Sequence, residues 1–288
     1  MKGWGMMRVI YRVFALAAAF LGLSQVSAFA ADPQNYQLGL SKPVDPTAAE
    51  QVWFHNDLML PIITVITVFV LFLLLFTCWR FSEKRNPKPS KTTHNSMLEV
   101  AWTLIPVLIL VAIAPFSLRL LYESDDTTNA AMNIKITGHQ WYWSYESPDQ
   151  DNLAFDSLLM ARTHEEAAEQ NVKRLMDVDN PMVVPTGTEI RVLITSGDVI
   201  HNWAVSEFGV RTDAVPGRLN EEGFMIPEGK EGMYYGFCSE LCGTDHAFMP
   251  IAVKAVSKAD FAKWVEKAKE EFASNDVEPT FKVASLLN

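Results

Sequence analysis

The residues best suited to chemistry lie close together near the C-terminal end of the chain, in the segment Cys-Ser-Glu-Leu-Cys-Gly-Thr-Asp-His-Ala-Phe-Met. It places Cys238, Cys242, His246 and Met249 within twelve residues. Soft thiolate and thioether ligands, together with imidazole, select copper over hard cations. Two cysteines four positions apart can each bridge two metal ions, whereas a blue site with one copper needs a single thiolate. The segment therefore predicts an electron-transfer centre with two copper ions.

A centre with two metal ions needs a terminal imidazole for each ion, and this segment supplies only His246. His201 is the best candidate for the second imidazole, because it follows a β-rich run at residues 188–195. One histidine on an early loop and the remaining ligands on a late loop is the usual arrangement for copper in a small Greek-key β-barrel. The spacing therefore predicts that the fold brings His201 to the late segment.

Each of these residues also has an ordinary structural interpretation. The two cysteines alone could form a disulfide or remain as buried thiols, and His201 alone could be a hydrogen-bonded core histidine. Zinc is the alternative metal, because two cysteines and two histidines form a common structural zinc site. Met249 has no role in a zinc site, and its presence favours copper.

Two uncharged segments precede the candidate centre and predict a membrane anchor. Residues 58–79 carry no charge over 22 positions, and residues 100–118 carry none over 19. At about 1.5 Å per residue, each is long enough to cross a hydrocarbon core of about 30 Å as a helix. We therefore predict transmembrane helices at residues 58–79 and 100–121, joined by a loop at residues 80–99.

The first thirty residues form a third apolar element of a different kind. Three basic residues precede a short apolar run at residues 13–23, and Ala28-Phe29-Ala30 has the small residues of a cleavage site. We predict a signal peptide at residues 1–30, with an additional membrane anchor as the alternative. Residues 31–57 then form an N-terminal segment on the exported side.

The charges beside the apolar segments predict their orientation. Residues 80–91 contain five basic residues and one acid, Glu83. Because basic loops stay on the cytoplasmic side of the membrane, this loop is predicted to be cytoplasmic. The processed N-terminus and everything after residue 121 then lie in a bacterial periplasm. The chain is thus predicted to be a multi-pass protein of the cell inner membrane.

The exported part runs from Tyr122 to Asn288, and its residues 122–274 have the size of one domain and an all-β pattern. Runs punctuated by proline and glycine predict strands at 132–138, 140–145, 182–184, 188–194, 232–237 and 251–256. A short helix is expected within residues 156–177, and acidic loops at 165–169 and 221–222. Ser257 caps a closing amphipathic helix that ends near Phe272. Residues 275–288 form a C-terminal tail.

Three separated motifs agree in order and spacing with those of a known family. They are residues 238–250, the aromatic string Gly-His-Gln-Trp-Tyr-Trp-Ser-Tyr-Glu at 138–146, and Arg-Thr-Asp-Ala-Val-Pro-Gly-Arg-Leu-Asn at 211–220. In these motifs the chain resembles subunit II of the bacterial cytochrome c oxidases, over about residues 45–264. The resemblance implies a membrane-anchored all-β protein, in which a two-helix transmembrane hairpin is followed by a cupredoxin-like Greek-key β-barrel.

The resemblance also implies a dinuclear copper centre, CuA, bridged by two thiolates. One copper would take a histidine and the thioether, and the other a histidine and a backbone carbonyl, that of Glu240. The implied metal ligands are His201, Cys238, Glu240, Cys242, His246 and Met249.

Three further roles follow from the resemblance. Trp141 would be the residue through which electrons enter from cytochrome c. The carboxylate of Glu240 would help to bind Mg²⁺ or Mn²⁺ at the boundary with oxidase subunit I. Glu99 is a candidate for the mouth of a proton channel, although a charge beside a spanning segment is more often a boundary marker. Haem would be present only in partner subunits, and the implied partners are cytochrome c, oxidase subunits I and III and membrane lipid.

The exported part is strongly acidic. From Tyr122 onward the chain carries 28 acids against 14 basic residues, and it carries a net charge of −10 overall. A field of this sign attracts basic partners and repels nucleic acid, so no nucleic-acid partner is expected. Together with the resemblance, the charge predicts a docking patch for cytochrome c at four acids after the aromatic string, namely Glu146, Asp149, Asp151 and Asp156.

Two other classes of protein share parts of this pattern. Subunit II of a quinol oxidase has the same architecture as a scaffold, but its family lacks the copper ligands that are present here. A membrane-tethered thiol-disulfide protein would use Cys238 and Cys242 as a redox pair, but the usual spacing there is two intervening residues instead of three. The third cysteine, Cys78, lies in the first apolar segment and has no partner within reach.

Overall fold

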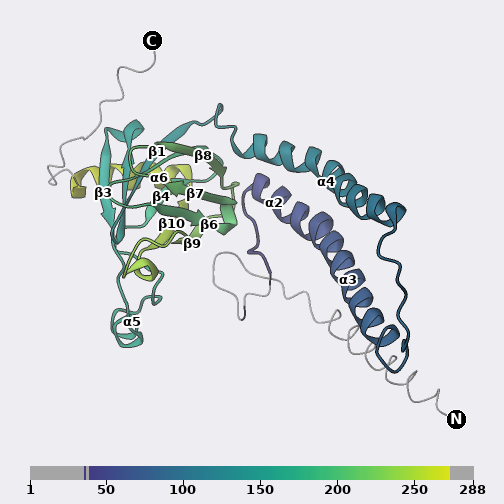
Figure 1. Ribbon diagram of the computed structural model, residues 1–288. Coiled ribbons are helices and arrows are strands. Elements are labelled where there is room, and N and C mark those ends of the chain that lie inside the picture. The colour runs from purple at the N-terminus through teal and green to yellow at the C-terminus, as the bar shows by residue number, and fades with distance from the viewer. Residues whose placement is uncertain (1–35, 37–38, 273–288) are drawn as a thin grey trace.

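The computed structural model describes residue 36 and residues 39–272 (Figure 1). The predicted signal peptide at residues 1–30 and the predicted tail at residues 275–288 lie outside the described residues. Within the described part, a hairpin of two long helices is followed by a β-domain. This is the predicted architecture of a membrane-anchored all-β protein.

The first arm of the hairpin is a continuous helical stretch from Pro46 to Arg80. It consists of α2 (Pro46–Trp53), a π-helical turn (Phe54–Met59) and α3 (Leu60–Arg80). The second arm is α4 (Ser96–Ser124). Both arms are long and apolar enough to cross a membrane, and neither α3 nor α4 has a buried side chain. Their apolar surfaces are therefore open to lipid or to partner subunits.

The connection between α3 and α4 lies at the end of the hairpin that is remote from the β-domain (Figure 1). It contains the basic residues Lys84, Arg85, Lys88 and Lys91. A basic loop at one end and an exported domain at the other is the arrangement expected from the positive-inside rule.

Within the described residues, the β-domain consists of two five-stranded sheets. One has the order β3-β2-β1-β5-β8, and the other has the order β4-β10-β9-β6-β7. The strands of the first sheet are β1 (Met132–His139), β2 (Tyr142–Ser147), β3 (Leu153–Ser157), β5 (Glu189–Ser196) and β8 (Asn220–Met225). The strands of the second are β4 (Met182–Pro185), β6 (His201–Val205), β7 (Val210–Ala214), β9 (Gly232–Cys238) and β10 (Pro250–Val256).

The core forms from side chains that alternate along the strands. In β1 and β5 every second residue is buried, as expected for strands with one face toward a core. Trp143 from the first sheet and Trp203 from the second are both completely buried in one apolar cluster. This sandwich fits the predicted cupredoxin-like class.

The six predicted strands are present, but β3, β6, β7 and β8 were not predicted. The acidic loops expected at residues 165–169 and 221–222 are wrong, because the first lies within helix α5 (His164–Gln170) and the second within β8. Pairing with β5 explains this strand: Arg191 forms an ion pair with Glu221, and Phe224 is buried. The predicted strand at 140–145 is also displaced, since β2 begins only at Tyr142 and Trp141 lies in the preceding turn.

The two predicted helices of the β-domain are confirmed. α5 (His164–Gln170) begins with a capping box, in which Thr163 and Glu166 bond each other's backbone amides. It lies on an arm that projects from the sandwich (Figure 1). α6 (Lys258–Phe272) closes the domain, and the hydroxyl of Ser257 accepts a hydrogen bond from the amide of Asp260.

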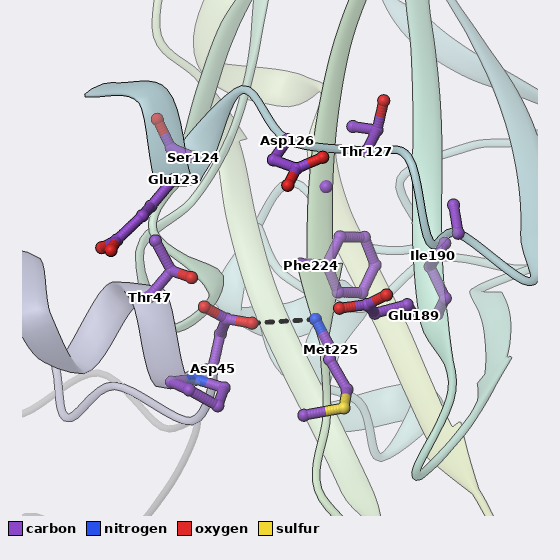
Figure 2. Close-up of a pocket in the computed structure, with 13 residues that line it drawn as sticks. Asp45, Thr47, Glu123, Ser124, Asp126, Thr127, Glu189, Ile190, Phe224 and Met225 are labelled. Atoms are coloured by element: carbon purple, nitrogen blue, oxygen red, sulfur yellow. Dashed lines mark hydrogen bonds between the residues drawn. The ribbon is translucent and has the colours of Figure 1, made fainter. Parts of the chain in front are cut away.

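A cavity of about 270 Å³ lies where the hairpin meets the β-domain, between α2, the end of α4 and strands β5 and β8 (Figure 2). Asp45 lies on its wall and is only 5% exposed. Its carboxylate accepts one hydrogen bond from the amide of Ala48, which caps α2 (2.9 Å), and another from the amide of Met225 in β8 (2.8 Å). A single carboxylate thereby ties the first helical arm to the β-domain.

Candidate metal centre

Two parts of the chain that are distant in the sequence supply the side chains of the candidate metal centre, His201 and residues 238–249. His201 is the first residue of β6, and Cys238 is the last residue of β9. Because β6 and β9 are antiparallel neighbours, with Trp203 opposite Cys238, these two ends lie together. The loop from β9 to β10 carries Cys242, His246 and Met249 back over the same spot.

The donor atoms converge within contact distance. Cys238 Sγ lies 3.9 Å from Cys242 Sγ and 3.8 Å from His201 Nδ1. Cys242 Sγ lies 3.5 Å from both His246 Nδ1 and Met249 Sδ. The backbone oxygen of Glu240 lies 3.3 Å from Cys238 Sγ. All six groups that the sequence predicted as ligands therefore surround one small volume.

The two cysteines are free thiols, so the disulfide interpretation does not hold. A disulfide needs sulfur atoms about 2.05 Å apart, and here they are 3.9 Å apart. With metal–thiolate bonds of about 2.3 Å, two sulfurs at this distance can bind the same ion. The set also fits copper better than zinc, since a buried thioether and a carbonyl accompany the thiolates and imidazoles.

The two thiols differ in acidity. Burial raises the pKa of Cys238, but hydrogen bonds with His201, with the backbone of Asn202 and Glu240 and with His246 outweigh it and lower the pKa to about 7. Burial and then the neighbouring Cys238 thiolate raise the pKa of Cys242 to about 12. Metal binding must therefore displace the proton of Cys242, while Cys238 gives up its proton more readily.

His201 is completely buried and is held on three sides. Its Nε2 lies 2.8 Å from Asp198 Oδ1, and its ring is 5.9 Å from that of Trp143 in an edge-on arrangement. Behind it is Gly138, where a Cβ would lie only 2.9 Å from His201 Cδ2. These contacts leave Nδ1 directed toward Cys238.

Met249 is 2% exposed and is positioned by the core. Its backbone oxygen accepts a hydrogen bond from Trp143 Nε1 at 3.3 Å. The loop that carries it is fastened from outside by Arg162, whose guanidinium pairs with Asp245 at 2.9 Å and lies over the ring of Phe248 at 4.7 Å.

Trp141 lies against the centre, in the turn between β1 and β2. Its indole Nε1 donates a hydrogen bond to the backbone oxygen of Cys242 at 3.3 Å, and Gln140 Nε2 donates to the same oxygen at 2.8 Å. Gly243 packs beneath the indole, with its virtual Cβ only 3.0 Å from Trp141 Cζ2. The ring is thus in contact with the chain of a predicted copper ligand.

The other predicted functional residues are placed in two regions. The side chain of Glu240 is exposed beside the centre. Glu99 lies in the first turn of α4, at the end of the hairpin that is remote from the β-domain, and its carboxylate accepts a hydrogen bond from the amide of Asn95. Glu99 is therefore not part of the candidate metal centre.

The four predicted docking acids have partners within the chain. Glu146 pairs with Lys135 at 3.0 Å, and Asp151 pairs with Lys269 at 2.7 Å. Asp149 accepts the amide of Asn133, and Asp156 accepts the hydroxyl of Ser144. Strand β2 carries Glu146 away from Trp141, whereas Asp156 lies opposite Ser144, nearer to Trp141.

Several residues that shape the centre were missed in the sequence. Asp198, Gln140, Gly138 and Gly243 are single polar or small residues in loops and strand ends, and no periodic pattern marks them. The position of Asp198 three residues before His201 is the only local signal, since neighbours of a metal-binding histidine often include a carboxylate.

The fold and the site together define a class: a membrane-anchored β-sandwich with a copper-binding set of soft ligands at one end. Two family models match the chain. The transmembrane domain of cytochrome c oxidase subunit II matches residues 33–120, and the periplasmic domain of the same subunit matches residues 132–256.

Two curated relatives agree with the family models. A probable cytochrome c oxidase subunit 2 of Rickettsia felis is 46% identical over 251 residues, covering 87% of this chain and 78% of the relative. Cytochrome c oxidase subunit 2 of Cereibacter sphaeroides is 40% identical over 277 residues, covering 88% and 90%. A solved structure, the periplasmic domain of subunit II of the cytochrome oxidase of Bradyrhizobium japonicum, is 51% identical and covers 51% of this chain and 99% of that chain, with a TM-score of 0.46.

The chain belongs to the cytochrome c oxidase subunit II family. It is one subunit of a haem-copper oxidase complex, anchored in the membrane by two helices with its C-terminal domain in the periplasm.

Proposed function

We propose that this subunit accepts single electrons from cytochrome c, stores them on two copper ions and passes them to haem in subunit I. Oxygen would be reduced to water in that partner, with coupled proton translocation across the inner membrane, so the subunit is not catalytic alone. The observation that carries the proposal is the convergence of six donor groups, two of them free thiols, from two distant parts of the chain.

The proposed ligands fall into bridging and terminal groups. Cys238 and Cys242 would bridge the two ions. The terminal groups would be His201 with Met249 and His246 with the carbonyl of Glu240. When bound, a thiolate-bridged copper pair supplies a one-electron store. Burial of His201, Cys238, Cys242 and Met249 keeps water away from this set, and the short loop holds its shape.

Trp141 is the residue through which we infer that electrons arrive. It is partly exposed, and its indole is hydrogen-bonded to the backbone of Cys242. An electron from a partner that covers Trp141 would therefore pass only through the indole ring and the backbone of Cys242 to reach the thiolate of Cys242. His246 is partly exposed and its Nδ1 lies 3.5 Å from the Cys242 sulfur, so it is the candidate for the side that faces haem.

Docking of cytochrome c would rely on acids near Trp141. Of the four acids predicted from the sequence, Asp156 lies nearest to the Trp141 turn, and Asp198 contacts that turn directly. Oxidation of limiting cytochrome c should therefore slow as ionic strength rises, because the Debye length falls from about 30 Å at 0.01 M to about 10 Å at 0.1 M. A rate that is insensitive to salt would contradict charge-guided docking.

Two further roles belong to this proposal. The exposed carboxylate of Glu240 is available to bind Mg²⁺ or Mn²⁺ jointly with subunit I. Glu99, at the loop end of α4, would face subunit I at the mouth of a proton channel. Subunit III and membrane lipid are the remaining expected contacts of the apolar helices.

Metal analysis of the purified oxidase tests the centre. We expect two copper ions bound through this chain, in addition to any in the partner. Cys238→Ser should abolish the signal of the copper pair while the chain remains in the membrane. An unchanged copper content in that variant would show that the thiolate does not bridge.

Trp141→Phe tests the route of the electron. An aromatic ring remains, so copper content and affinity for cytochrome c should be preserved, but oxidation of cytochrome c should fall by orders of magnitude. Reduction of the partner haem from prereduced copper, timed after photoreduction, should stay normal. Equal slowing of both half-reactions would identify Trp141 as a packing residue.

A further inference from the structure

Asp198 makes two hydrogen bonds that connect different parts of the centre. It lies in the turn between β5 and β6, three residues before His201. Its Oδ1 is 2.8 Å from His201 Nε2, and its Oδ2 accepts the backbone amide of Gln140 at 2.7 Å. Gln140 directly precedes Trp141. One carboxylate therefore contacts both a proposed copper ligand and the turn that presents the proposed electron acceptor.

We propose that Asp198 is a positioning residue, which fixes the tautomer and orientation of His201 and couples them to the position of Trp141. The inference rests on the proposed function, because it takes His201 as a metal ligand and Trp141 as the residue that receives electrons. It adds a residue to that site and gives it a structural task that is separate from attracting a charged partner.

The tautomer follows from the geometry of the two ring nitrogens. A carboxylate accepts hydrogen bonds and does not donate them, so Asp198 places the proton of a neutral His201 ring on Nε2. The lone pair of Nδ1 is then free, and this atom faces Cys238 Sγ at 3.8 Å. Carboxylates that bind the outer nitrogen of a metal-binding histidine orient the ring and increase its basicity in this manner.

The Asp198 carboxylate is itself held in place. Oδ1 accepts the amide of Val199 at 2.6 Å and lies 3.4 Å from the hydroxyl of Ser196. That hydroxyl also lies 3.2 Å from the backbone oxygen of Gly138, the residue packed behind the His201 ring. The turn and the ring are therefore fixed to the same point of strand β1.

The second bond extends the connection to the thiolates. Gln140 donates its backbone amide to Asp198 and its side-chain amide to the oxygen of Cys242, and Trp141 donates to that same oxygen. Cys242 in turn lies beside Cys238, which contacts His201. The result is a closed ring of contacts, so displacement of Asp198 should shift both His201 and Trp141.

His201 and His246 differ in the partner of the ring nitrogen Nε2. His246 is partly exposed, and among the described residues no carboxylate is found within hydrogen-bonding distance of its Nε2. Loss of the Asp198 carboxylate should therefore act on the His201 side of the centre.

The test uses the complete oxidase with Asp198→Asn, Asp198→Glu and, as a control, Asp156→Asn. The control removes the same charge close to the Trp141 turn, but Asp156 bonds Ser144 and no proposed ligand. Three properties of the copper centre are measured in each complex: its electron paramagnetic resonance spectrum, its reduction potential and its rate of copper loss to a chelator.

We expect Asp198→Asn to bind copper about 10–100-fold more weakly than the unmodified oxidase, the range found for supporting residues of metal sites, and to lose it faster to a chelator. Its spectrum and potential should change as well. Asp198→Glu keeps the charge but moves the carboxylate by one methylene, and it should share these changes in weaker form. Asp156→Asn should match the unmodified oxidase in all three properties.

Two results would overturn the inference. If Asp198→Asn and Asp156→Asn agree in all three copper properties and alter only the salt dependence of cytochrome c oxidation, Asp198 is a docking charge. If Asp198→Asn is impaired but Asp198→Glu is fully normal, charge and not position is what matters. Absence of a copper pair in the unmodified oxidase would instead refute the proposed function.

Discussion

Gly138→Ala is a sharp test of how tightly the centre is built. Gly138 lies at the end of β1, and an added Cβ would lie 2.9, 3.0 and 3.1 Å from Cδ2, Cγ and Cβ of His201. Carbon atoms prefer separations of about 3.5–4.0 Å, so the ring or the strand must move by about half an ångström. Neither moves freely, because Asp198 and Trp143 hold the ring while β2 and β5 hold the strand.

Overpacking of this kind costs about 1–3 kcal/mol. Replacing glycine by alanine also reduces the freedom of the unfolded chain, which returns about 0.4–1 kcal/mol. The net loss should therefore be about 1–2 kcal/mol, and at about 2–4 °C per kcal/mol for a domain of this size the midpoint of thermal unfolding should fall by about 2–8 °C. Because the displaced group is His201, copper content should fall as well.

Thermal unfolding of the detergent-solubilised chain and its copper content measure the two effects. Gly223→Ala is the matched control, since Gly223 also lies in a strand and its virtual Cβ meets only Thr127 Cγ2 at 3.3 Å as a close contact. We expect this control to keep its copper and to change stability by less than Gly138→Ala. Equal stability in the two variants, with full copper content in both, would refute the idea that Gly138 clamps His201.

Three further changes test separate parts of the structure. In the copper-free chain, alkylation of Cys238 should rise with pH through about 7, because its pKa is lowered to about 7. Cys242, whose pKa is raised to about 12, should stay protonated and unlabelled. Equal labelling of both thiols at pH 8, measured by mass spectrometry, would contradict these assignments. Met249→Leu should keep both copper ions but shift the reduction potential, because a weak axial thioether affects the potential of copper more than its binding. Loss of both ions on metal analysis would show that this role is wrong. Asp45→Ala should lower stability by about 1 kcal/mol for the lost helix cap and by about 1–3 kcal/mol for the unpaired amide of Met225. The Met225 amide should therefore exchange its hydrogen faster, while copper content is unchanged. Unaltered exchange would mean that the hydrogen bond between Asp45 and Met225 in Figure 2 does not stabilise the junction.

The elements that could be predicted from the sequence are those whose signal is local. The two apolar segments needed only a count of uncharged residues, and they lie within the helices Pro46–Arg80 and Ser96–Ser124. The closing helix was also visible, because Ser257 provides a cap and the apolar residues repeat at helical spacing. In each case the residues that determine the element are neighbours in the chain.

Strands β6, β7 and β8 could not be predicted in the same way. β8 has the sequence Asn-Glu-Glu-Gly-Phe-Met, in which acids and a glycine resemble a loop. It becomes a strand because β5 offers backbone partners along its length, together with Arg191 as a partner for Glu221. The free energy that forms such a strand comes from residues about thirty positions away, and no local pattern contains it.

The metal centre also has features that the sequence predicts and features that only the tertiary structure determines. The proposal of copper rests on the sequence alone, because Cys238, Cys242, His246 and Met249 lie within twelve residues and the chemistry of their donor atoms is a property of the residue types. The contacts of Asp198 and Gln140 follow only from the tertiary structure. They depend on the parallel register of β1 and β5, which places Ser196 opposite Gly138 and so brings the turn before His201 against the turn that contains Trp141. That register joins two strands of one sheet that are far apart in the sequence, and it determines which ligand is held and how the aromatic turn meets it.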